Sequence, residues 1–230
     1  MSLFAIGDTH LSFGVEKPMD VFHGWNDYEK RLEENWRNIV GEDDTVLICG
    51  DVSWGMKLGE ALPDFKFLDS LPGKKLLMKG NHDYWWETKA KMKRLLDDNS
   101  ISSIDFLFNN AIQLGTGSVA GTKGWFYDSG ADDEEKALNR ELCRLRLSLQ
   151  EATKLGGEPV AFLHYPPISN RAVCEEIVDL LTEFDVKRCY YAHLHGASIK
   201  NAFTGEYKNI RFHLISGDSL GFCPKLVEKF

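Results

Sequence analysis

The sequence contains neither a long apolar run nor a targeting segment. No stretch approaches the roughly 20 consecutive apolar residues that cross a bilayer. The segment from Met1 to Gly7 is too short for the hydrophobic region of a signal peptide, and it leads directly into Asp8. These two absences argue against a membrane protein and predict a soluble, cytoplasmic one.

Cysteine is scarce and shows no pairing pattern. The count of five is odd, and no C-x-x-C spacing occurs. A disulfide framework uses an even number of regularly spaced cysteines, so this pattern indicates a reducing compartment. The five are Cys49, Cys143, Cys174, Cys189 and Cys223.

An excess of positive charge is also missing. Lys and Arg number 27 against 35 Asp and Glu, which gives a formal net charge of −8. Nucleic-acid binding requires a basic surface that neutralises phosphates, so nucleic acid is not the expected partner. The negative net charge is still compatible with a small anionic substrate, because bound divalent cations would make the electrostatic potential at the binding site positive.

No internal repeat, low-complexity segment or linker divides the 230 residues, so we expect one domain over residues 1–230. Short apolar runs alternate with helical patterns, which predicts an α/β fold. Strands are expected over residues 3–6, 45–49, 74–78, 104–108, 111–114, 118–120, 159–163 and 186–192. Helices are expected over 26–40, 58–71, 87–98, 132–155 and 174–184, and a polar hairpin over 200–214 with its turn near Thr204-Gly205.

Histidines and acidic residues gather in short motifs. Five of the seven histidines lie in Asp8-Thr9-His10, Gly80-Asn81-His82-Asp83, His164-Tyr165-Pro166 and His193-Leu194-His195, and Gly50-Asp51 adds a carboxylate. Histidine is mostly neutral near pH 7, so grouping it with Asp and Asn assembles metal ligands rather than a charged surface.

The motifs share one position in the predicted fold. Asp8, Asp51, Asn81, His164 and His193 each follow a predicted strand by one to three residues. In open α/β sheets, ligands bind outside the carboxyl ends of the strands. We therefore expect these residues, remote in sequence, to converge at one edge.

The donor set predicts the chemistry. Seven donors, namely Asp8, His10, Asp51, Asn81, His164, His193 and His195, exceed one tetrahedral site but suit two ions that share a carboxylate. Mixed nitrogen and oxygen donors without thiolate favour Mn, Fe or Zn, and disfavour a structural zinc site. Two such ions about 3.5–4 Å apart can lower the pKa of a shared water and clamp the oxygens of an in-line phosphoryl displacement. His82 is then free to act as general acid, with Asp83 orienting its ring.

Each motif alone is weak, but their ordered combination resembles the calcineurin-like metallophosphoesterase superfamily. The family signature of Asp-x-His, Gly-Asp, Gly-Asn-His-Asp/Glu, His and Gly-His-x-His matches from Asp8 to His195. The resemblance implies a four-layer fold, in which a β-sandwich of two mixed sheets is flanked by helices. It also implies that Asp8, His10, Asp51 and His195 hold one ion, and that Asp51, Asn81, His164 and His193 hold the other. Asp51 would bridge the two, and His82 with Asp83 would be the catalytic pair.

The chain departs from the family pattern at two places. Ala192 stands where glycine usually precedes His-x-His, which matters only if that position needs a positive φ. Val52-Ser53-Trp54 follows Asp51 without the second acidic residue often found there. This second departure leaves all seven ligands in place and affects the metal affinity.

Two interpretations are open for the tryptophans near the motifs and for Arg171. Trp54, Trp85 and Trp86 either form an aromatic wall for substrate or pack in the core, and packing is favoured because a Trp buries a large area. Arg171 either pairs with a substrate phosphate or is a solvated charge, and the sequence favours neither.

The expected function is hydrolysis of a phosphomonoester or phosphodiester bond in a small phosphorylated substrate, by in-line attack of a metal-bridging hydroxide. A nuclease of the same superfamily is one alternative, which the acidic charge balance disfavours. A non-catalytic interaction module is another, which the complete ligand set disfavours. The substrate, the native metal and the oligomeric state do not follow from the sequence.

Overall fold

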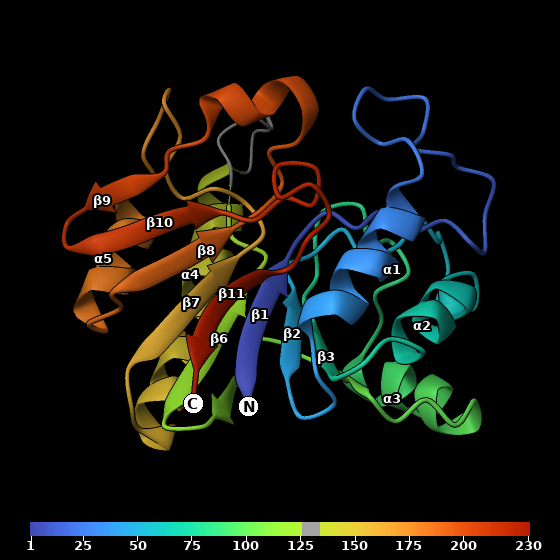
Figure 1. Cartoon of the computed structure of the whole chain (residues 1–230). Coiled ribbons are helices and arrows are strands. Elements are labelled where there is room, and N and C mark those ends of the chain that lie inside the picture. Colours follow the sequence, from blue (N-terminus) through green and yellow to red (C-terminus); the bar gives the residue numbers. More distant parts are fainter. Residues whose placement is uncertain (126–133) are drawn as a thin grey trace.

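The computed structural model describes residues 1–125 and 134–230, and it contains two β-sheets (Figure 1). The first sheet has the order β11-β1-β2-β3-β4. Its strands are β1 (Ser2–Ile6), β2 (Thr45–Ile48), β3 (Lys74–Leu77), β4 (Ile104–Phe106) and β11 (Lys225–Lys229). Strands β1 to β4 pair in parallel and β11 pairs antiparallel with β1, so the sheet is mixed.

The second sheet has the order β5-β6-β7-β8-β10-β9. Its strands are β5 (Ala111–Leu114), β6 (Gly117–Thr122), β7 (Pro159–Leu163), β8 (Arg188–Tyr191), β9 (Gly205–Tyr207) and β10 (Ile210–Leu214). The central strands β6, β7, β8 and β10 are parallel, and both edge strands are antiparallel to their neighbours.

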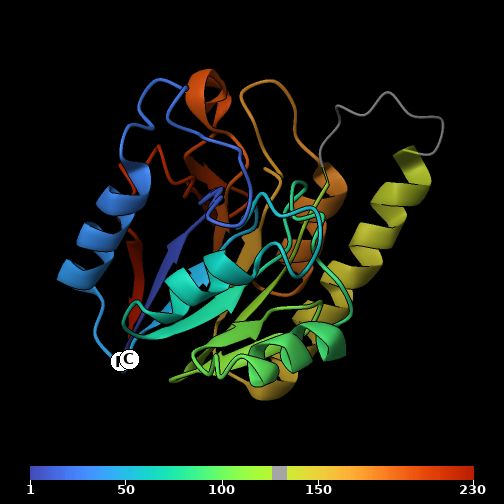
Figure 2. The ribbon, with the colours of Figure 1, turned by 90° about the vertical axis from the view of Figure 1, so that its right-hand side faces the viewer.

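Helices cover the outer faces of the two sheets (Figures 1 and 2). The first sheet carries α1 (Tyr28–Ile39), α2 (Leu62–Asp69) and α3 (Lys89–Asp98), and the second carries α4 (Glu134–Leu155) and α5 (Glu175–Glu183). A short 3₁₀-helix, η1 (Gly196–Asn201), follows β8. The predicted start of α4 at residues 132 and 133 lies outside the described residues. None of the helices in the described ranges is long and apolar enough to cross a membrane.

Three apolar clusters separate the four layers. Alternate residues of β1 enter different clusters: Leu3 and Ala5 face the second sheet, while Phe4 and Ile6 face the helices. Strand β7 repeats this, because Phe162 lies between the sheets and its neighbours face α4 and α5. Successive side chains of a strand point to opposite faces, so a strand buried on both faces reads as a continuous apolar run. The predicted fold of two mixed sheets with flanking helices is confirmed.

The predicted C-terminal hairpin differs from the structure in two respects. Its turn is at Lys208-Asn209, both with positive φ, rather than at Thr204-Gly205. A two-residue loop with both residues left-handed matches the twist of a hairpin. Strand β10 is also not a solvent-facing strand, since it pairs in parallel with β8 and buries Ile210 and Phe212.

Strand β11 was not predicted. Only Val227 of its five residues is buried, because an edge strand lies partly in solvent and carries little apolar signal. Its pairing with β1 brings the termini together, and the Phe230 N–H donates to the Met1 carbonyl at 3.0 Å (Figure 2). All five cysteines lie in the described part of the chain, and all are free thiols.

Candidate metal centre

The carboxyl ends of the parallel strands bring the predicted ligands together. Several of the predicted ligands form two groups, and within each group the ligand atoms lie within 4.8 Å of one another. Asp8, His10 and Asp51 form one group, and Asp51, His164 and His193 form the other. Asp51 belongs to both groups. The groups join the two sheets, because Asp51 follows β2 of the first sheet while His164 and His193 follow β7 and β8 of the second.

The Asp51 carboxylate lies between the imidazoles of the two groups. Its Oδ2 atom is 3.7 Å from His10 Nε2 and 3.5 Å from His164 Nε2, and it has no hydrogen-bond partner in the described part of the chain. Its Oδ1 atom accepts the backbone N–H of His82 at 2.8 Å. A buried carboxylate oxygen without a donor is costly, so its position indicates a place for a cation.

His10 is also unsatisfied. Both of its ring nitrogens are buried and lack hydrogen-bond partners among residues 1–125 and 134–230. Burial, with the neighbouring His195 and His82, lowers the pKa of His10 well below its usual value, so the ring is neutral and offers a lone pair. The Trp54 indole stacks on this ring at 4.6 Å between ring centres and 20° between planes, which fixes its orientation.

His164 and Asn81 point at the same spot. His164 Nε2 lies 2.8 Å from Asn81 Oδ1, and the other ring nitrogen, Nδ1, lies 3.0 Å from the Cys49 carbonyl oxygen. Burial lowers the pKa of His164 to about 3, so the ring carries one proton and can donate to only one of these oxygens.

Asp8 and His193 are linked across the sheets. The Asp8 carboxylate accepts the backbone N–H of His193 at 2.9 Å. Burial and the charge of Asp51 raise the pKa of Asp8 well above its usual value. Burial lowers the pKa of His193 to about 3. His195 is in neither group, although its ring lies 5.3 Å from that of His10 in an edge-on arrangement.

The backbone of the ligand loops is strained. Asp8, His10, Asp51 and His193 all have positive φ, between 42° and 70°. Such conformations cost of order 1 kcal/mol or more for residues with side chains, and they cluster at functional sites. The strand ends are also tightly apposed, since a β-carbon at Gly80 would lie 2.1 Å from Asp51 Oδ1 and one at Gly50 2.6 Å from His164 Nδ1. The close packing of the loops therefore requires glycine in both motifs.

The residues present fit a metal centre. Two mutually repelling carboxylates, neutral imidazoles and an amide oxygen face one another, and within the described residues the two His10 ring nitrogens and Asp51 Oδ2 have no hydrogen-bond partner. A bound cation would satisfy all these acceptors at once.

His82 lies beside the two groups. Its half-buried ring is 4.7 Å from that of Trp54 and 5.8 Å from that of His10. Burial lowers the pKa of His82, the charge of Asp51 raises it, and the charge of Lys17 lowers it further, with a net decrease. The exposed Lys17 side chain is nearby, with its Nζ atom 3.7 Å from the centre of the Trp54 ring.

Asp83 differs from its predicted role of orienting the His82 ring. It is fully buried and accepts four backbone N–H groups, from Asp51, Val52, Ser53 and Gly80 at 2.7–3.3 Å, together with Trp85 Nε1 at 2.9 Å. Both carboxylate oxygens are therefore used by the loops after β2 and β3. Asp83 fixes the position of Asp51 instead of the ring of its neighbour.

All three tryptophans lie in or against the apolar cluster between the first sheet and its helices, as the favoured interpretation predicts. Trp85 is in the core, and Trp86 packs against it while stacking on Phe108. Trp54 lies at the centre against His10, and its importance there had no sequence signal beyond its place after Asp51.

Both departures from the motif have structural explanations. Ala192 does not have a positive φ, and its methyl group faces Gly7, where a β-carbon would lie 2.4 Å away. Ser53 donates to Asp64, a buried carboxylate from α2 that also accepts the Phe13 N–H at 2.8 Å. A carboxylate that is remote in sequence thus supports the Asp51 loop.

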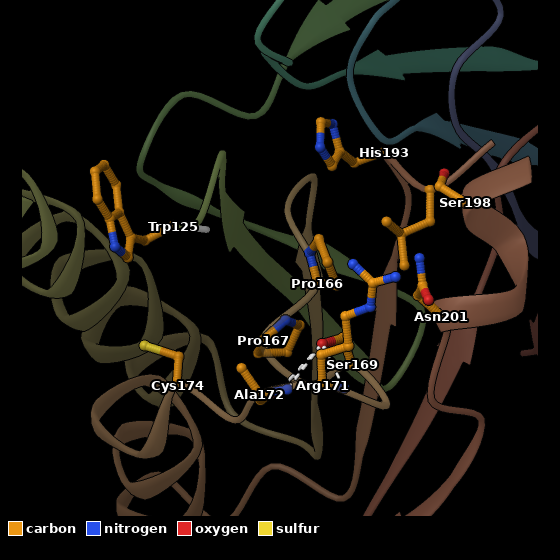
Figure 3. A pocket seen from close by; sticks show the side chains of 11 residues that line it. Trp125, Pro166, Pro167, Ser169, Arg171, Ala172, Cys174, His193, Ser198 and Asn201 are labelled. Carbon is orange, nitrogen blue, oxygen red and sulfur yellow. Dashed lines mark hydrogen bonds between the residues drawn. The ribbon is translucent and has the colours of Figure 1, made fainter. Parts of the chain in front are cut away.

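Arg171 lies in a cavity that begins at His193 (Figure 3). The cavity has a volume of about 330 Å³, and Trp125, Pro166 and Asn201 are among the residues that line it. In Figure 3 the Arg171 side chain extends from its loop into this space.

Comparison with known proteins agrees with the predicted family and fold. A family model described as calcineurin-like phosphoesterase matches residues 1–197. The chain belongs to this family of metal-dependent phosphoester hydrolases. The Gene 66 protein of Mycobacterium phage L5 is 36% identical over 76 residues, which is 32% of this chain and 36% of that protein, so the match spans about a third of the relative.

Solved structures share the fold at low identity. A protein of unknown function from Aquifex aeolicus has 13% identity and a TM-score of 0.51, with 98% of this chain and 95% of that one covered. GAP50, the anchor in the inner membrane complex of Plasmodium, has 11% identity and a TM-score of 0.57, with 95% and 72% covered.

Proposed function

We propose that this protein is a dinuclear-metal-dependent phosphohydrolase that cleaves phosphomonoester or phosphodiester bonds in small phosphorylated molecules. The observation that carries the proposal is the position of Asp51, which belongs to both ligand groups and whose Oδ2 atom has no donor among the described residues. A carboxylate in this position suits two cations better than one.

Asp8, His10, Asp51 and His195 would hold one ion, and Asp51, Asn81, His164 and His193 would hold the other. Mn, Fe or Zn suits these nitrogen and oxygen donors. When bound, two such ions supply charge neutralisation for a phosphoryl group and a nucleophile at neutral pH.

The chain's own residues complete the site. His82 has a partly exposed ring at the rim and would donate a proton to the leaving oxygen. Trp54 would keep His10 in its orientation through the stacked contact. Asp83 would hold the Asp51 loop through its backbone contacts, and Arg171 would bind substrate.

The test uses the purified chain loaded with Mn or Fe, assayed on aryl phosphate monoesters and diesters alongside elemental analysis. We expect close to two ions per chain and metal-dependent hydrolysis. Two bound ions without hydrolysis would instead support the non-catalytic alternative, and no stoichiometric metal would refute the proposal. Cleavage of DNA with a steep salt dependence would favour the nuclease alternative.

A further inference from the structure

The cavity beside the metal centre has one charged end. His193 belongs both to a ligand group and to the cavity lining, so the cavity lies next to the centre. Among the lining residues that belong to the described ranges 1–125 and 134–230, Arg171 is the one permanently charged side chain and none is acidic. A molecule that reaches from His193 into the cavity therefore meets a single positive charge.

Arg171 has no counter-ion within the described residues, although most of the other arginines described do. Arg37, Arg144 and Arg188, for example, each pair with a glutamate. A guanidinium group has five donors in a planar fork that matches a carboxylate or phosphate. An arginine that lines a cavity without an acidic partner can bind an anionic ligand.

The loop that carries Arg171 is held in place. The buried Ser169 Oγ accepts the backbone N–H of Arg171 at 3.2 Å and that of Ala172 at 3.1 Å. Asn170 is tied to the η1 end, because its N–H donates to the Asn201 carbonyl at 2.8 Å and its Nδ2 to the Lys200 carbonyl at 3.1 Å. The base of the side chain is thus fixed before ligand binds, which lowers the cost of ordering it.

The other walls of the cavity suit a ligand with a small carbon skeleton. Pro166 and Pro167 form a stiff side, and Trp125 contributes an aromatic side whose Nε1 atom is buried and unpartnered within the described residues (Figure 3). A volume of about 330 Å³ is at the lower end for small-molecule pockets.

We propose that Arg171 binds a second anionic group, a carboxylate or a phosphate, on the non-reacting part of a small phosphate ester whose phosphoryl group lies at the metal centre. This inference rests on the proposed function for the position of the phosphoryl group. It assigns the substrate class as phosphate esters with two separated anionic groups.

Two matched pairs of probes test it. Glycerol 3-phosphate and 3-phosphoglycerate differ by a carboxylate, and fructose 6-phosphate and fructose 1,6-bisphosphate differ by a phosphate. Binding to the metal-loaded chain is measured by calorimetry and hydrolysis by phosphate release, for the wild type, Arg171→Gln and Arg94→Gln. Arg94 is a matched control, because it is 84% exposed on α3 and belongs to a weak helical ion pair.

In the wild type we expect the doubly anionic member of at least one pair to bind about tenfold or more tightly, the scale of charge-assisted hydrogen bonds. This ratio should fall towards one in Arg171→Gln and stay unchanged in Arg94→Gln. The pair that responds identifies a carboxylate or a phosphate as the group bound.

The outcomes separate this inference from the proposed function. If the chain hydrolyses phosphate esters but the ratios are near one, or survive in Arg171→Gln, the inference is wrong and the function stands. If no probe is hydrolysed but the binding preference depends on Arg171, the assigned ligand class stands and the proposed catalysis falls. If binding shows no preference in the wild type, the inference is overturned whatever the activity.

Discussion

His164 Nε2 lies 2.8 Å from Asn81 Oδ1, while the Nδ1 atom of the same ring lies 3.0 Å from the Cys49 carbonyl oxygen. A neutral imidazole has one proton for these two oxygens. If Nδ1–H donates to Cys49, the lone pairs of Nε2 and Asn81 Oδ1 face each other. In that tautomer the contact is favourable only with a positive charge beside it, so a bound cation would join these two residues, which are 83 positions apart.

Asp51→Asn should stabilise the metal-free chain and remove its response to metal. Burial raises the pKa of Asp51 to about 6, and an amide could donate to the His10 and His164 nitrogens that lie within 3.7 Å. We expect a gain of about 1–3 kcal/mol without metal, the usual range for relieving a buried unsatisfied group.

The same variants test the metal response. Mn²⁺ at about a hundred times its dissociation constant should stabilise the wild type by about 2.7 kcal/mol, seen as a rise in melting temperature that a chelator reverses. Asp51→Asn should show no such rise. A wild-type-like response in Asp51→Asn would contradict the bridging position of Asp51.

His82→Gln should reduce turnover by about 10²–10⁴-fold, the typical contribution of a general acid, and leave the metal content unchanged. The reason is that its ring lies at the rim of the ligand groups without belonging to either. Kinetics and elemental analysis on the same preparation check this. His213→Gln is the control, because His213 stacks on Tyr190 in the second sheet. Loss of metal in His82→Gln would show that His82 is a ligand.

Asp83→Asn should destabilise the fold by several kcal/mol. The Asp83 carboxylate accepts five N–H groups, and an amide nitrogen in place of one oxygen would face donors and leave them unsatisfied. Urea unfolding measures the change. A loss of activity with unchanged stability would instead support the role first predicted for Asp83, that of orienting the His82 ring.

The stability of the wild type relative to Asp64→Asn should depend on pH. Burial raises the pKa of Asp64 to about 6, from 3.8 in the unfolded chain. Between these values the folded chain binds a proton that the unfolded chain does not, so stability increases as pH falls. The difference of about two pKa units corresponds to a gain of at most about 3 kcal/mol between pH 7 and pH 4.

Unfolding curves of both proteins across that range measure this gain. Asp97→Asn, at an exposed position of α3, controls for the loss of one carboxylate. A stability difference between the wild type and Asp64→Asn that is independent of pH, or that grows as pH rises, would contradict the prediction.

The sequence by itself determined the elements with strong local patterns and the candidate ligands. Runs such as Thr45–Ile48 and Pro159–Leu163 are apolar throughout because both faces of each strand are buried, and such runs are visible without a structure. The motifs after these strands are weak one by one, and it is their ordered combination that predicted the centre.

The tertiary structure alone decided what depends on contacts between distant segments. Asp64 supports Ser53, Trp54 stacks on His10, and Asp83 turns from its neighbour towards the Asp51 loop. Strand β11 and the position of β10 beside β8 likewise follow from pairing partners far along the chain. Local patterns report which face of an element is apolar, whereas the choice of partner depends on how all layers pack together.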